Sequence, residues 1–271
     1  MVEDGAATAE RARARELVPT NEILREITRG GLAGLIAGVL VAGIGGRLVM
    51  RLAALLVPES LGRFTENGNR IGDITAGGTF ALILFIGLFV GLVGGSLWVT
   101  MRPWLPDAAG LRAIVSIPIA IALGTKGLVE GANPDFRVLG GSEVVVASLV
   151  TLVALYGPVI VLADVWLEAR LPHAAQDDRR VVQSYGAVTL LGLALGLMAI
   201  VPAYLGPEDL RPAGIAIGVV GVATLASWRS RVVGRPLPGW IAPIARIAIV
   251  IAVIAGSAVV LGEVSEAISQ G

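Results

Sequence analysis

The chain has 271 residues, of which 55% are hydrophobic and only 15% are charged. Soluble domains carry roughly 25% charged residues, and here the deficit extends along the whole chain, which excludes a soluble domain with one membrane anchor. The formal net charge is zero, so bulk electrostatics gives no reason to expect a nucleic acid partner. The composition predicts an integral membrane protein whose main partner is the lipid bilayer.

Several kinds of chemistry are excluded by the side chains that the sequence lacks. There is no cysteine, and His173 is the single histidine. Disulfides, thiolate metal sites and cysteine nucleophiles therefore do not arise, and neither does a haem held by two histidines. We expect no metal, no cofactor and no enzymatic activity, although a site built only from carboxylates is not excluded by composition.

The N-terminal segment, residues 1–29, is expected to be a cytoplasmic tail. It is rich in Ala, Arg and Glu, and Pro19-Thr20-Asn21 is typical of a helix start. We expect a short interfacial helix there, leading into the first span. Residues 30–271 are expected to form a single transmembrane helical domain.

The rest of the chain contains seven apolar segments that approach the length of a bilayer-crossing helix, about 20 residues. They are residues 31–56, 74–101, 111–129, 144–168, 182–204, 213–229 and 241–262. The third and the sixth are the shortest. The pattern predicts an all-α, polytopic transmembrane bundle of about seven spans.

Basic residues give the orientation of this bundle. In the loops and at the span ends, thirteen arginines lie at one set of ends and four at the other. Because cytoplasmic loops carry the excess of Lys and Arg, we expect the N-terminus in the cytoplasm and the C-terminus outside. The strong excess of arginine over lysine is typical of GC-rich coding and carries no functional information. We expect the protein to lie in the plasma membrane of a bacterium.

The first span opens with five small residues spaced four apart: Gly30, Gly34, Gly38, Ala42 and Gly46. Small residues at this spacing let helix backbones approach closely in lipid. We expect tight packing within the chain. The alternative is that such faces, which recur at Gly192, Gly196, Gly214 and Gly218, bind a second copy or a membrane partner.

Charged residues gather on the predicted outer side. They come from the end of the first span, the loop after it, and the end of the third span with its following loop. The set is Arg47, Arg51, Glu66, Arg70, Asp73, Lys126, Glu130, Asp135 and Arg137. Ionisable residues in spans are functional candidates by default. Two interpretations remain: a salt-bridge network that closes the loops, or a binding site for an anion or polar solute. Asp73 is also the expected N-cap of the second span.

A second charged group lies on the predicted inner side. Asp164 and Glu168 are four residues apart near the end of the fourth span, and Arg246 lies near the start of the seventh. We expect an ion pair between Asp164 and Arg246. The alternatives are side chains that reach the lipid headgroups, and a proton relay at Asp164.

These features favour transport of a small polar or anionic solute through an outer, charged vestibule. Pro118, Pro158 and Pro202 fall inside spans, where proline removes a helix hydrogen bond and commonly kinks the helix. The alternative function is a non-catalytic structural or assembly subunit of a membrane complex.

Overall fold

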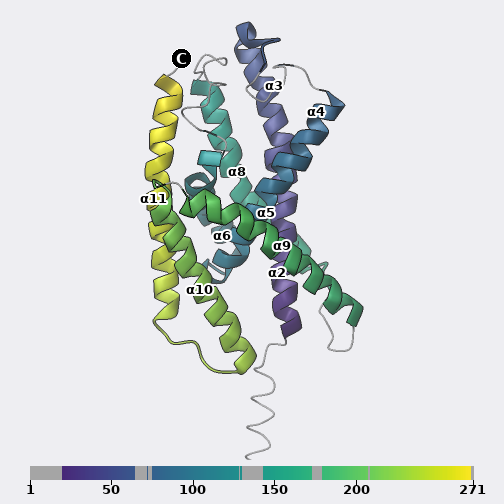
Figure 1. The fold of residues 1–271 in the computed structure, drawn as a ribbon, viewed down its shortest axis with the longest axis vertical. Helices are drawn as coiled ribbons and strands as arrows, with labels where there is room; N and C mark the ends of the chain where they lie inside the picture. Colours follow the sequence, from purple (N-terminus) through teal and green to yellow (C-terminus); the bar gives the residue numbers. More distant parts are fainter. Residues whose placement is uncertain are drawn as a thin grey trace, which may run out of the picture.

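The structure is a computed structural model that describes residues 20–64, 72, 75–127, 129, 143–172, 179–206 and 208–269. These residues form helices and their connections, with no strand among them (Figure 1). The expected all-α helical bundle is confirmed. Helices are favoured in lipid because the backbone polar groups of a helix form hydrogen bonds within the same segment.

The first helix is continuous from Thr20 to Leu56. It comprises α2 (Thr20–Ala37), a π-helical segment η1 (Gly38–Gly45) and α3 (Gly46–Leu56). It runs without a break through residue 30, where we expected an interfacial helix to give way to the first span. A short 3₁₀ turn, η2 (Pro58–Ser60), follows it, because proline cannot continue the hydrogen-bond ladder.

The second long helix repeats this construction. It comprises α4 (Ala76–Ala81), the π-helical segment η3 (Leu82–Gly87) and α5 (Leu88–Met101), with the 3₁₀ turn η4 (Arg102–Trp104) after it. Thr75, rather than the expected Asp73, caps α4: its side chain accepts a hydrogen bond from the backbone N–H of Gly78. Asp73 itself lies outside the described residues.

The remaining helices are α6 (Ala109–Gly124) with the 3₁₀ turn η5 (Thr125–Gly127), α8 (Glu143–Glu168), α9 (Arg179–Leu205), α10 (Arg211–Val233) and α11 (Ile241–Ser269). Pro118, Pro158 and Pro202 lie inside α6, α8 and α9, as expected. Gly234 ends α10 with a φ of 67°, a left-handed conformation that glycine adopts without steric cost.

Six of the described helices are long and apolar enough to cross a bilayer, so the chain is a multi-pass membrane protein. The segment expected as the third span is shorter: α6 has 16 residues. At 1.5 Å per residue it is roughly 24 Å long, less than the ~30 Å thickness of the hydrocarbon layer.

Small residues hold the first two long helices together. A Cβ added to Gly34 would collide with the backbone of Gly95 and Gly91, and one on Gly38 with the backbone of Gly87. The ladder from Gly30 therefore packs against α5 within the same chain. Close backbone approach of this kind replaces the hydrophobic driving force that lipid removes.

The buried core lies between α2, α5, α6, α8, α10 and α11, and Trp98, Ile160, Val220 and Ala252 belong to it. The helix α9 crosses the other helices obliquely (Figure 1). The start of α2 and the end of α11 lie at opposite ends of the molecule (Figure 1). We call them the α2 end and the α11 end.

Candidate functional site

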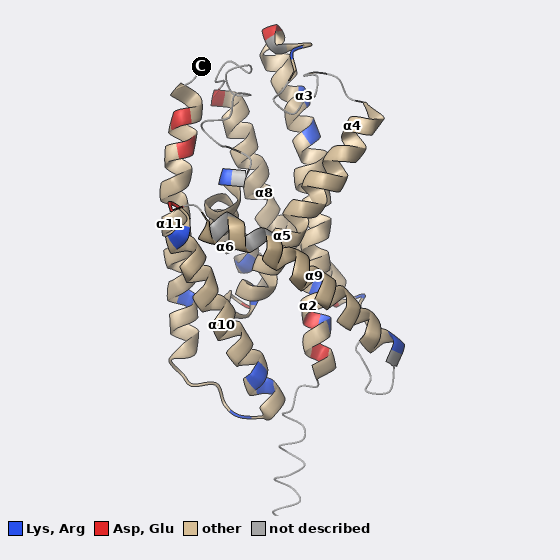
Figure 2. Cartoon of the chain, in the orientation of Figure 1, with Lys and Arg blue, Asp and Glu red and all other residues tan. Residues whose placement is uncertain are grey.

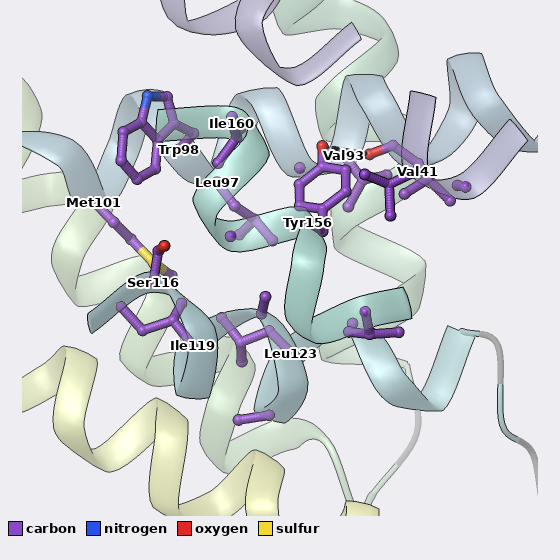
Figure 3. A pocket seen from close by; sticks show the side chains of 18 of the residues that line it. Val41, Val93, Leu97, Trp98, Met101, Ser116, Ile119, Leu123, Tyr156 and Ile160 are labelled. Carbon is purple, nitrogen blue, oxygen red and sulfur yellow. Dashed lines mark hydrogen bonds between the residues drawn. The ribbon is translucent and has the colours of Figure 1, made fainter. Parts of the chain in front are cut away.

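A cavity of about 360 Å³ lies within the bundle between α5, α6 and α8. Apolar side chains line nearly all of it, and Figure 3 shows Leu97, Met101, Ile119, Leu123 and Tyr156 around it. Ligand pockets of proteins range from about 300 to 1,000 Å³ and are lined mainly by apolar groups with a few polar ones. The cavity falls within this description.

Few polar groups reach the cavity. The hydroxyl of Tyr156 lies 3.2 Å from the carbonyl oxygen of Gly34 and 3.3 Å from that of Val90, to which it can donate. The missing side chain of Gly94 makes room for this hydroxyl. The hydroxyl of Ser116 donates to the carbonyl oxygen of Ala113 at 2.7 Å. Both hydroxyls thus already have partners, and the cavity offers a ligand little beyond apolar contact.

Among the described residues, one charged side chain lines the cavity, that of Lys126 in η5, which directly follows α6. The ammonium group of Lys126 donates a hydrogen bond to Asp209 and lies 2.9 Å from a carboxylate oxygen of Glu263. We call these three residues the lysine cluster. The hydrogen bond raises the pKa of Lys126 and lowers the pKa of Asp209, because each charge stabilises the other.

Of the other predicted outer residues, Arg47 and Arg51 are described, and neither belongs to this cluster. Arg47 is half-buried and donates to the hydroxyl of Thr79 at 3.3 Å, while Arg51 is exposed and donates to the carbonyl oxygen of Gly72 at 2.9 Å. Arg47 thus ties α3 to the start of the second long helix, and Arg51 ties α3 to a residue that precedes that helix. The remaining predicted members lie outside the described residues: Glu66, Arg70, Asp73, Glu130, Asp135 and Arg137.

Sequence reasoning missed both acidic partners of Lys126. Asp209 precedes α10 and Glu263 lies near the C-terminal end of α11, where Figure 2 shows the acidic residues of that helix. A signal was available, since the predicted topology places both residues on the outer side with Lys126. The sequence gives no measure of which outer charges become neighbours.

The predicted pair between Asp164 and Arg246 is wrong. Asp164 accepts a hydrogen bond from Nε of Arg29 at 2.9 Å and another from Nε of Arg102 at 2.8 Å, whereas Arg246 is exposed on α11. The reason is packing: α8 lies against α2, which carries Arg29.

Asp164 thus belongs to a buried network at the α2 end, which we call the arginine cluster. Its members are Arg29, Arg102, Asp164 and Glu168, with Arg29 and Arg102 both pairing with Glu168 as well. Asp164 and Arg29 each expose only 2% of their side chains. Figure 2 shows the charged residues of α2 on its lower half, where this cluster lies.

A neighbouring arginine extends this network. Arg25 is buried, pairs with Glu168 at 3.4 Å, and donates to the carbonyl oxygens of Glu168 and Leu171. Such carbonyl groups at the end of α8 have no partner within the helix. The start of α2 is thereby fastened to the end of α8. In the sequence, Arg25 and Arg29 are two of the thirteen arginines whose distribution predicts the orientation, and nothing local marks them as partners of Asp164 and Glu168.

Comparison of the chain with protein-family models, curated proteins and solved structures finds no match. The cavity and the two ion clusters are the features of the molecule that bear on its function.

Proposed function

We propose that the protein is a membrane transport protein whose solute occupies the central cavity. The observation that carries this proposal is the position of the cavity, which is lined by α5, α6 and α8, with Lys126 toward one end and Met101 toward the other. Solute sites of many transporters lie within the bundle near the middle of the membrane.

The chemistry of the lining favours a mainly apolar solute. Moving an unpaired charge into an apolar environment is very unfavourable, and Lys126 is already matched by two carboxylates. The sequence alone had favoured a polar or anionic solute. The cavity supports instead a small neutral or amphiphilic molecule, held by apolar contact with Leu97, Ile119 and Leu123.

Irregular helices around the cavity support a role that requires movement. Val41 and Ala42 of the π-helical segment η1 line the cavity, and η1 packs against the second π-helical segment, η3. Such segments are rare in proteins as a whole, but many of those that occur lie at functional sites. Pro118 and Pro158 lie in the two other lining helices. Each of these features weakens the regular hydrogen-bond ladder.

The test is flux into proteoliposomes. Neutral, cationic and anionic aromatic fluorophores of matched size are offered to the purified protein, and uptake is compared with empty liposomes. We expect uptake of the neutral probe, and we expect the Leu123→Trp variant, which fills the cavity, to abolish it. The control is Leu111→Trp on the same helix, since Leu111 is 51% exposed. The proposal is refuted if the parent protein and the Leu111→Trp control both fail to take up any probe.

A second candidate is the structural or assembly subunit. It is favoured by small residues that the chain leaves open: a Cβ on Gly192 of α9 or Gly218 of α10 would meet no atom within 4 Å. A second copy or another membrane protein could pack there. Cross-linking from Cys substituted at position 218, in mild detergent, tests this idea, and a monomer without adducts would refute it.

The location is also a proposal. We infer the plasma membrane of a bacterium, with the arginine-rich α2 end in the cytoplasm, from the distribution of basic residues.

A further inference from the structure

The central cavity lies between the two ion clusters. Toward the α2 end its lining includes Met101 and Ile160. Arg102 directly follows Met101, and Asp164 lies one helical turn beyond Ile160. The arginine cluster therefore occupies the next layer of the bundle below the cavity.

The arginine cluster joins segments that would have to separate for a solute to leave at this end. Asp164 on α8 is bonded to Arg29 of α2 and to Arg102 of η4. One nitrogen of the buried Arg29 guanidinium, Nη2, has no hydrogen-bond partner. Glu168 keeps 47% of its side chain exposed, so water reaches the edge of the cluster.

The lysine cluster has the corresponding position at the α11 end. Lys126 itself lines the cavity, and so does Leu210, the residue next to Asp209. The cluster joins η5, the segment before α10, and α11 through ion pairs. These are again three separate segments that meet beyond one end of the cavity.

We infer that the two ion clusters are the two gates of the cavity: the arginine cluster closes it at the α2 end and the lysine cluster at the α11 end. This inference rests on the proposed transport function. The buried pair of Asp164 and Arg29 in the arginine cluster is suited to such a role because losing one partner leaves the other charge uncompensated. The arginine cluster therefore has two discrete states, one with its ion pairs made and one with water in their place. The lysine cluster is partly exposed, with 26% of the Lys126 side chain accessible, so its ion pairs separate at a lower cost.

Side-specific labelling of one cysteine tests the gates without any solute. The chain has no cysteine, so Ser116→Cys provides a single, nearly isosteric reporter inside the cavity, where Ser116 is 3% exposed. The protein is reconstituted in vesicles of defined orientation, and a membrane-impermeant maleimide is added to one face at a time. Arg246→Gln serves as the matched control for loss of an intramembrane charge outside both clusters.

We expect Asp164→Asn to raise labelling from the face at the α2 end by at least about tenfold. We expect Lys126→Gln to raise labelling from the opposite face by roughly two- to fivefold, because the lysine cluster is partly exposed. Should Asp164→Asn fail to fold, Arg102→Gln breaks the same cluster at a side chain that is 25% exposed. Unchanged labelling in the cluster variants overturns the inference. A rise from both faces also overturns it, because that result indicates general loosening.

Flux measured on the same vesicles separates the two proposals. Face-specific labelling without uptake of any probe retains the gates and rejects the proposed solute transport. Uptake with labelling that is the same in all variants retains transport and rejects the gates.

Discussion

Asparagine at position 164 removes the charge at the centre of the arginine cluster while keeping the size of the side chain. Asp164 and Arg29 expose only 2% of their side chains, and Nη2 of Arg29 already lacks a partner. Removing one partner of a buried pair costs about 3–5 kcal/mol, since the remaining charge stays buried. We expect Asp164→Asn to destabilise the protein by this amount.

The assay is thermal unfolding in detergent, followed by size-exclusion chromatography after heating. For a chain of this size, ~1 kcal/mol corresponds to roughly 2–4 °C, so the expected fall in Tm is on the order of 10 °C. The control is Asp209→Asn, which breaks a pair whose carboxylate side chain is 43% exposed. An exposed pair contributes about 1 kcal/mol or less, so this variant should melt close to the parent protein.

A double variant tests the reason for the loss. If the cost of Asp164→Asn comes from the uncompensated guanidinium, adding Arg29→Gln should cost less than the sum of the two single changes. The reasoning is refuted if Asp164→Asn melts like the parent protein. It is also refuted if the two changes are additive, because the residues would then not act as a pair.

Three further predictions concern other parts of the structure. Asp209→Asn should melt slightly below the parent protein at neutral pH, and this small difference in Tm should vanish in acid. The lowered pKa of Asp209 gives stability that is present above its unfolded pKa of about 3.9. That stability is lost as pH falls through the folded pKa. The raised pKa of Lys126 acts oppositely, so the difference should also fade as pH rises through the folded pKa, above about 10.4. Gly34→Leu should separate α2 from α5 and destabilise by at least about 1–3 kcal/mol, seen as a lower Tm, whereas Gly192→Leu, at an open position, should not. Tyr156→Phe removes the hydroxyl that donates a hydrogen bond to a carbonyl oxygen of α2 or α5, and should lower Tm by an amount equivalent to about 1 kcal/mol. An unchanged Tm would show that this hydroxyl is not bonded.

Local sequence patterns determined the class of fold. Long apolar segments predict helices because a bilayer leaves the backbone no other partner than itself, and the helices found agree closely with the predicted segments. The ladder from Gly30 predicted close packing within the chain, and Gly34 and Gly38 do pack against α5. These features depend on residues a few positions apart, so they can be seen without knowing which helices are neighbours.

Only the tertiary structure decided how the charges pair. Asp164 binds Arg29 and Arg102 rather than Arg246, and Lys126 binds Asp209 and Glu263. The cavity likewise depends on how α5, α6 and α8 pack against one another. The physical reason is that hydropathy fixes the depth of a residue in the membrane but not its direction around the bundle. A charge and its partner must agree in both, and the second is set by helix packing alone.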